Sequence, residues 1–307
     1  MANPNSSPGK PHESFPSPMG AVLLSIAGLF AVWFVASLVL STGLLEESSM
    51  MAAMGVGYAL GLGAIATLAA KRVPEPHAAR LGLQGFPPAL IGALICLLPV
   101  LFLVSEVDNY WKLLIPASPE IEELRQELEI LMRRDSPFAL AQTSIVALGI
   151  VPIVEGFFFF GVILQGLVAR LGRGRGLFLT AVLYSLVHFP ASGAPGDTLV
   201  PFTTWLTLGA LMGLGRLASG SILPPIALGA GFAALHLAAD LGREAVPIPG
   251  FNAPGEHTSA FILLAAAASV ALGTWQLWQV ALTQPTTIPI PKKQYADDEE
   301  EGGGFFL

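Results

Sequence analysis

Long uninterrupted runs of apolar residues dominate the chain, and short polar segments separate them. Most runs reach the roughly 17–25 residues that an α-helix needs to cross about 30 Å of hydrocarbon. A lone strand would leave its backbone unpaired in lipid, so we expect helices. The pattern predicts an all-α, polytopic transmembrane helical bundle of about eight spans, two of which (176–189 and 222–237) are short. The eight runs are 19–45, 50–70, 88–104, 137–167, 176–189, 199–214, 222–237 and 259–282.

Polar segments flank this apolar region at both ends of the sequence. We expect residues 1–18, which are rich in Pro and Ser, to be a disordered tail, and residues 19–283 to form one transmembrane domain. Residues 284–307 read as a second disordered tail that carries the acidic run 297–301, the main source of the net charge of −7.

The connection before the fourth run contains one predicted amphipathic helix. Ser118 is a suitable N-cap and Pro119 fits the first turn. Leucines at 124, 128 and 131 then share one face. Such a helix lies on the membrane surface, roofs a cavity, or is a solvated connector.

Composition agrees with a lipid environment. Hydrophobic residues make up 53% of the chain and charged residues only 12%, whereas a soluble domain is about a quarter charged. There is no basic patch with interleaved aromatic residues, so we expect the lipid bilayer and no nucleic acid as a partner.

Basic residues favour alternate connections between the runs. They occur at Lys71 and Arg72, at Arg170, Arg173 and Arg175, at Arg216, and in the C-terminal tail at Lys292 and Lys293. Because cytoplasmic loops carry an excess of Lys and Arg, both termini are predicted to be cytoplasmic. We expect a multi-pass protein of a bacterial inner membrane. The third connection, which holds basic residues among many acids, departs from this alternation.

Few ionisable residues lie within the apolar runs, and each is costly there, by roughly 2.5–3.5 kcal/mol on insertion scales. They are Glu155, His188, His236 and Asp240. Glu155 and His188 lie on consecutive runs, 14 and 13 residues from the connection that joins them. Both are therefore roughly 20 Å from that face. A carboxylate and an imidazole at one depth form a candidate general-base unit.

The sequence around these residues resembles the CAAX protease and bacteriocin-processing (CPBP, or Abi) family of intramembrane proteases. That family has a Glu-Glu-x-x-x-Arg motif, a Phe-x-x-x-His motif on the next span, and a later His-x-x-x-Asn/Asp motif. Glu155 stands in the first-Glu position, and Tyr184-Ser-Leu-Val-His188 is similar to the second motif, with Tyr for Phe. The resemblance covers roughly residues 80–240.

The sequence departs from this family at four motif positions. Gly156 and Phe160 stand where the second Glu and the Arg belong, and Gly229 and Ala233 fall at the His and Asn/Asp positions of the third motif. His236 and Asp240 have the third-motif spacing but lie seven residues further on, two helical turns along.

The resemblance implies an intramembrane endopeptidase that acts on a membrane-associated protein or peptide. Glu155 and His188 would activate a water, and His236 and Asp240 would assist if the helix register permits. The resemblance requires no cofactor, although Glu155, His188 and His236 would also make a His₂Glu zinc set. Two other functions stay open: a catalytically inactive pseudoprotease that acts as a membrane scaffold or binding protein, which the four departures favour, and a small-solute transporter.

Overall fold

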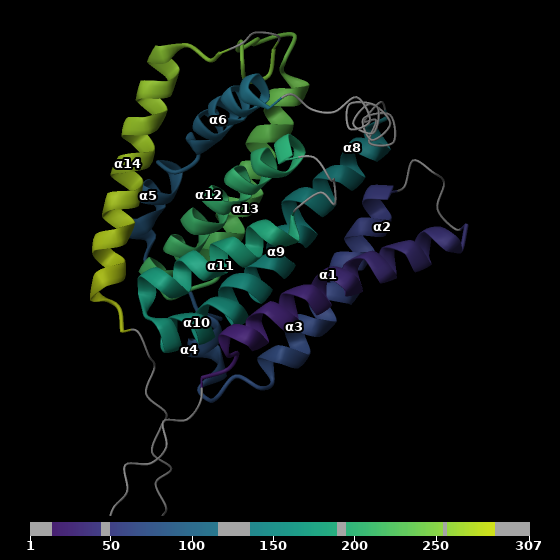
Figure 1. The fold of residues 1–307 in the computed structure, drawn as a ribbon, viewed down its shortest axis with the longest axis vertical. Coiled ribbons are helices and arrows are strands. Elements are labelled where there is room, and N and C mark those ends of the chain that lie inside the picture. Colours follow the sequence, from purple (N-terminus) through teal and green to yellow (C-terminus); the bar gives the residue numbers. More distant parts are fainter. Residues whose placement is uncertain (1–13, 44–49, 116–135, 189–194, 254–256, 286–307) are drawn as a thin grey trace, which may run out of the picture.

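The computed structural model describes residues 14–43, 50–115, 136–188, 195–253 and 257–285, and within them the chain forms a helical bundle (Figure 1). In these ranges there is no β-strand, only one isolated bridge between Pro249 and Ala253. The all-α prediction is confirmed. The helices and π-helical (η) segments are α1 (Pro18–Ser41), α2 (Met50–Val56), η2 (Gly57–Leu62), α3 (Gly63–Ala70), α4 (His77–Leu81), the 3₁₀ turn η3 (Pro88–Leu90), α5 (Ile91–Ile95), α6 (Val100–Leu114), α8 (Pro137–Ser144), η4 (Ile145–Ile150), α9 (Val151–Glu155), η5 (Gly156–Ile163), α10 (Leu164–Leu171), α11 (Arg173–Val187), α12 (Pro195–Ser219), α13 (Leu223–Leu241) and α14 (Ala260–Thr283).

Six continuous helical stretches in the described part are long and apolar enough to cross a membrane. They are Pro18–Ser41, Met50–Ala70, Pro88–Leu114, Pro137–Leu171, Leu223–Leu241 and Ala260–Thr283. The predicted short run 222–237 is thus a full 19-residue helix. The two other predicted spans correspond to α11, of 15 residues, and α12, which pack closely against each other inside the bundle. The protein is therefore a multi-pass membrane bundle.

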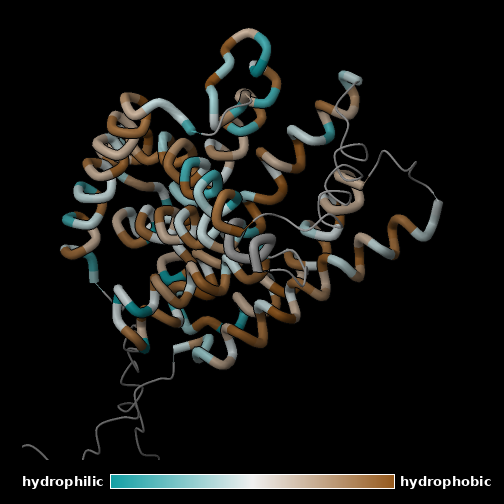
Figure 2. Tube along the Cα trace, turned by 45° about the horizontal axis from the view of Figure 1, so that its top comes forward, coloured by the Kyte–Doolittle hydropathy of each residue, from teal (hydrophilic) through white to brown (hydrophobic). Residues whose placement is uncertain are grey.

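The first and last spans form the outer surface of the bundle. In the most apolar 18 residues of α1 only 22% are buried, and in those of α14 only 17%. Large apolar side chains such as Phe30 and Phe261 are 71% and 82% exposed. Figure 2 shows hydrophobic residues, in brown, along the outer faces of these helices. Such faces are stable only against lipid.

The core of the bundle is built on η5, between α3, α11, α12 and α13. Phe158, Phe159 and Phe160 are at most 1% exposed, and Phe159 meets the ring of Tyr184 edge-on at 5.2 Å. The Phe run could have faced lipid or packed between helices; it packs between helices. This packing places Glu155, directly before η5, at the centre of the molecule.

Both ends of the described helical domain meet at the turn between α10 and α11. Arg170 Nε donates to the Ser14 carbonyl at 2.8 Å, and an Arg173 guanidinium nitrogen donates to the Gln284 carbonyl. The start of α1 and the end of α14 therefore lie on one side of the bundle (Figure 1). That arrangement requires an even number of crossings.

Arg216 corrects one detail of the charge pattern. It was counted as a basic residue of a connection, but it lies in the last turn of α12 and is only 9% exposed. The predicted amphipathic helix at 118–133 and the predicted disordered character of 1–13 and 286–307 lie outside the described residues.

Candidate active site

Glu155 and His188 are in direct contact. The His188 Nε2 atom lies 2.9 Å from Glu155 Oε1, and Glu155 is only 4% exposed. Glu155 is the last residue of α9, whereas His188 directly follows the last residue of α11. Two consecutive spans therefore bring the two side chains to one depth, as their equal distance from the shared turn predicts.

The end of α11 fixes the orientation of the His188 ring. The His188 backbone N–H bonds the Ser185 carbonyl at 3.1 Å, which leaves the Tyr184 carbonyl without its usual helical donor. His188 Nδ1 lies 2.7 Å from that carbonyl oxygen. Because a carbonyl only accepts, Nδ1 carries a hydrogen. On its face the ring is stacked by Trp205, with centroids 4.1 Å apart and an interplanar angle of 24°.

Two tyrosine hydroxyls also form hydrogen bonds with the Glu155 carboxyl group. Tyr184 donates to Oε2 at 3.0 Å, and Tyr58, from η2, forms a second side-chain hydrogen bond to Glu155. His188 Nδ1 already holds its own hydrogen, so one further proton lies between His188 Nε2 and Glu155 Oε1. The group is therefore fully hydrogen-bonded, as a buried carboxyl requires.

Three π-helical segments surround this site. Glu155 lies between η4 and η5, and Tyr58 is the second residue of η2. A π-turn inserts an extra residue per turn and so redirects the side chains around it. Such segments are rare and occur frequently at functional sites.

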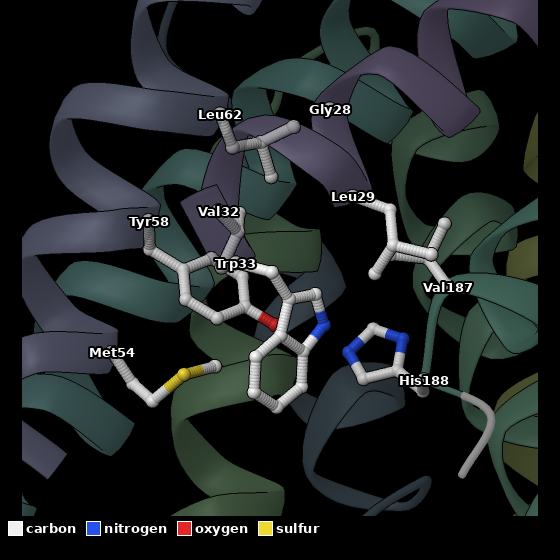
Figure 3. Close-up of a pocket in the computed structure, with 9 residues that line it drawn as sticks. All are labelled: Gly28, Leu29, Val32, Trp33, Met54, Tyr58, Leu62, Val187 and His188. Carbon is white, nitrogen blue, oxygen red and sulfur yellow. The ribbon is translucent and has the colours of Figure 1, made fainter. Parts of the chain in front are cut away.

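A pocket of about 270 Å³ opens beside the pair, between α1, η2 and the end of α11. It is mostly apolar, and in the view of Figure 3 the side chains of Tyr58 and His188 lie on opposite sides of the Trp33 indole. Glu155 is not part of the lining and lies behind these two residues. The pocket lining consists of Gly28, Leu29, Val32, Trp33, Met54, Tyr58, Leu62, Val187 and His188.

The other two candidate residues do not join this pair. His236 and Asp240 lie in the C-terminal turns of α13, and both side chains are exposed. The two-turn shift that would bring them to the site does not occur. The structure therefore does not assemble the zinc set of Glu155, His188 and His236, and the described residues include no group of three His, Cys, Asp or Glu that could hold a metal.

At positions 156 and 229 the sequence departs from the family motifs, and both residues lie where helices pack closely together. A Cβ on Gly156 would lie 2.4 Å from Ile226 Cγ1 of α13. One on Gly229 would lie 3.4 Å from Pro152 Cβ, one turn before Glu155. Small residues thus let α13 lie against α9, in the register of the third motif but without its polar side chains.

An arginine does reach position 160, although from another helix. Arg216 Nε donates to the Phe160 carbonyl at 3.1 Å, and its NH2 group donates to the Arg80 carbonyl at 2.9 Å. One guanidinium therefore ties α12 to η5 and α4, close to the position where the family motif has its own arginine.

Sequence reasoning missed Tyr58 and Trp205. Tyr58 lies on the second span, before the region of resemblance. Its only signal was a hydroxyl within an apolar run, between Gly57 and Gly61. Tyr184 was noted as a replacement for Phe, and the structure shows what its extra hydroxyl contacts.

A comparison with protein families adds an independent observation. Residues 137–235 match the sequence model of a family described as Type II CAAX prenyl endopeptidase Rce1-like. The matched segment runs from α8 into α13; it contains Glu155 and His188 and ends directly before His236. No curated protein and no solved structure matches the chain. The central third of the chain, residues 137–235, is thus similar to the Rce1-like family, in agreement with the resemblance to the CPBP intramembrane proteases.

Proposed function

We propose that this protein is an intramembrane endopeptidase that hydrolyses a peptide bond of a membrane-associated protein or peptide. The observation that carries the proposal is the 2.9 Å contact between Glu155 and His188, buried in the bundle and bordered by an apolar pocket. The match of residues 137–235 to the Rce1-like family model supports the reaction class. The proposal assigns Glu155 as the general base and His188 as the residue that positions the water.

The donors around Glu155 define how the reaction would run. His188 Nδ1 is held by the Tyr184 carbonyl, so the ring exchanges protons only through Nε2. The proposal places the shared proton on Nε2, which leaves the Glu155 carboxylate as the base. A water that enters from the pocket separates Glu155 from His188 and lies between them. Catalytic hydrogen bonds commonly rearrange in this way when substrate binds.

The proton and bond changes then balance. Glu155 takes a proton from the water while the water oxygen attacks the peptide carbonyl carbon. This attack gives a tetrahedral intermediate. The carbon–nitrogen bond breaks as the protonated Glu155 returns the proton to the leaving amine. The products are a carboxylic acid and an amine, and His188 keeps the attacking water oriented toward the substrate.

Proteolysis by the purified protein in liposomes tests this assignment. The substrate is a peptide with an apolar segment that anchors it in the membrane, and cleavage is followed by mass spectrometry. Glu155→Gln keeps the shape of the side chain but cannot act as a base. We expect its rate to fall at least about 100-fold, the lower end of general-base contributions, and His188→Asn to fall comparably.

Two residues of α13 provide matched controls. His236→Ala and Asp240→Asn remove polar side chains of the same types from a neighbouring span, outside the site. We expect both to cleave at nearly the wild-type rate. Full activity in Glu155→Gln, or a wild type that cleaves no anchored peptide, would refute the proposal.

A catalytically inactive pseudoprotease is the second candidate. The observation that favours it is that α13 fills the third-motif His position with Gly229, against Pro152, so α13 supplies no polar side chain from that position. Such a protein would bind an anchored peptide with the same affinity in wild type and Glu155→Gln, and would release no product from it.

A further inference from the structure

The two tyrosines that bond Glu155 have different surroundings. Tyr184 is 3% exposed and enclosed by the rings of Phe159 and Phe160. Tyr58 lines the pocket and is only half-buried. A substrate in the pocket would therefore reach the Tyr58 hydroxyl but not that of Tyr184.

We propose that the Tyr58 hydroxyl is the hydrogen-bond donor that stabilises the oxyanion formed when the water attacks the peptide carbonyl. This inference rests on the proposed function and adds a catalytic residue to it. Tyr58 is in the second span, outside both the matched family segment and the region that resembles the family motifs.

The position of Tyr58 suits this task. Its side chain lines the same pocket as His188, whose ring lies 2.9 Å from Glu155, and it interacts with the Glu155 carboxyl group itself. Tyr58 therefore borders the space from which a water would reach Glu155. A carbonyl attacked by that water must lie next to the water. The Tyr58 hydroxyl is consequently beside the carbonyl oxygen on which charge develops, as an oxyanion donor must be.

The movement of charge during the reaction also favours a change in the hydrogen-bond acceptor of the Tyr58 hydroxyl, from Glu155 to the substrate oxygen. Before reaction it donates to a carboxylate, and bonds to charged acceptors are roughly twice as strong as neutral ones. When Glu155 takes the proton of the water, the carboxyl becomes neutral and the negative charge moves to the substrate oxygen. Rotation of the O–H bond then directs the same hydrogen to the stronger acceptor.

Trp33 is the competing donor in the pocket, since its indole N–H also borders it (Figure 3). Trp33 is 49% exposed and belongs to the lipid-facing α1. Unlike Tyr58, it forms no recorded hydrogen bond with Glu155. We therefore assign it to the pocket wall.

Single-turnover and steady-state cleavage by Tyr58→Phe tests the inference. The substitution removes only the hydroxyl. We expect kcat to fall about 100- to 1,000-fold, the loss found when one oxyanion donor is removed, with KM changed less than about threefold. Trp33→Phe, which removes the competing N–H from the pocket wall, should lower kcat much less than Tyr58→Phe does. Tyr110→Phe, at an exposed tyrosine of α6, is the unchanged control.

Binding of a phosphinate peptide separates this role from a structural one. A phosphinate at the scissile position carries a tetrahedral centre with a charged oxygen, so wild type should bind it more tightly than the parent amide. Tyr58→Phe should lose about tenfold or more of that preference while it binds the amide as before.

The outcomes distinguish the two proposals. If wild type cleaves in a Glu155-dependent way but Tyr58→Phe keeps its kcat and its phosphinate preference, Tyr58 is not the oxyanion donor and the proposed function stands. A loss in Trp33→Phe instead would give the role to Trp33. If wild type neither cleaves nor prefers the phosphinate, both proposals fail together.

Discussion

Residue 156 carries no side chain because a neighbouring helix occupies the space. A Cβ there would approach Ile226 Cγ1 to 2.4 Å, much closer than van der Waals contact. Ile226 is β-branched and therefore has little rotamer freedom in a helix. Gly156, which replaces a motif glutamate directly beside Glu155, is thus required by the bulk of Ile226 on α13.

Substitution at this position tests that link. We expect Gly156→Ala to lower the melting temperature of the protein in detergent, because overpacking costs about 1–3 kcal/mol and outweighs the gain of about 0.5–1 kcal/mol from replacing a helical glycine. Gly149→Ala is the matched control, since a Cβ there meets open space. It should leave the melting temperature unchanged or raise it.

A double-mutant cycle identifies the contact responsible. Ile226→Ala should offset much of the loss in Gly156→Ala, with a coupling energy of about 0.5–3 kcal/mol, as for other residues in contact. Strictly additive effects of the two substitutions would show that Ile226 does not exclude a side chain from position 156.

At the scale of elements, a second Glu–His pair, in which only the glutamate is buried, holds the connection between α13 and α14 onto α6. Glu106, 6% exposed, bonds His257 Nδ1 at 2.7 Å and the Thr258 backbone N–H at 2.9 Å. Asn109 donates to the Gly250 carbonyl at 2.7 Å. The polar face of α6 therefore anchors the connection that lies between two spans.

We expect Glu106→Gln to loosen this connection. The substitution removes the charge that strengthens two hydrogen bonds, each worth about 1.5–3 kcal/mol when one partner is charged. Because His257 is partly exposed, water replaces part of that loss. Unfolding free energy should fall by about 1–3 kcal/mol, and limited proteolysis should cut residues 242–253 sooner.

Glu244→Gln is the control for this element. Glu244 is an exposed acid in the same connection, so its neutralisation changes charge without removing these bonds. Equal protease sensitivity of the two variants would mean that charge alone, and not attachment to α6, protects the connection.

The length and apolar character of the helices could be predicted from sequence, whereas the local register could not. Runs of 20 residues without charge have one stable form in lipid, so the spans follow directly. The π-helical segment that carries Tyr58 leaves no such signal, because it depends on how η2 packs against α1. Sequence could not settle the register of α13 for a similar reason: Gly229 lies against Pro152 of α9, whereas His236 and Asp240 are exposed.

At the scale of the whole molecule, equal depth was enough to predict that Glu155 and His188 meet. Both residues were counted from one shared turn. Because the rise per residue in a helix is fixed, equal numbers of residues from that turn give equal depths in the bundle. Tyr58 lies on a span that does not share this turn, so the same count could not include it. The Glu155–His188 contact was predictable because both residues are counted from one turn, whereas Tyr58 is not.

The orientation of the bundle in the membrane gives the last prediction. Both ends of the helical domain lie beside the turn that carries Arg170, Arg173 and Arg175, and the α13–α14 connection lies at the opposite end (Figure 1). Because basic residues favour the cytoplasmic side, the first face should be cytoplasmic. Replacing Cys96, the single cysteine, by Ala allows one new cysteine at a time to be placed and labelled with a membrane-impermeant maleimide. Cysteines at Gly174 and Pro285 should label only after the cells are permeabilised, and one at Glu244 should label in intact cells. If the residues at 174 and 285 labelled from different sides, the number of crossings between them would be odd. If all three labels were reversed, the charge rule would be wrong for this protein.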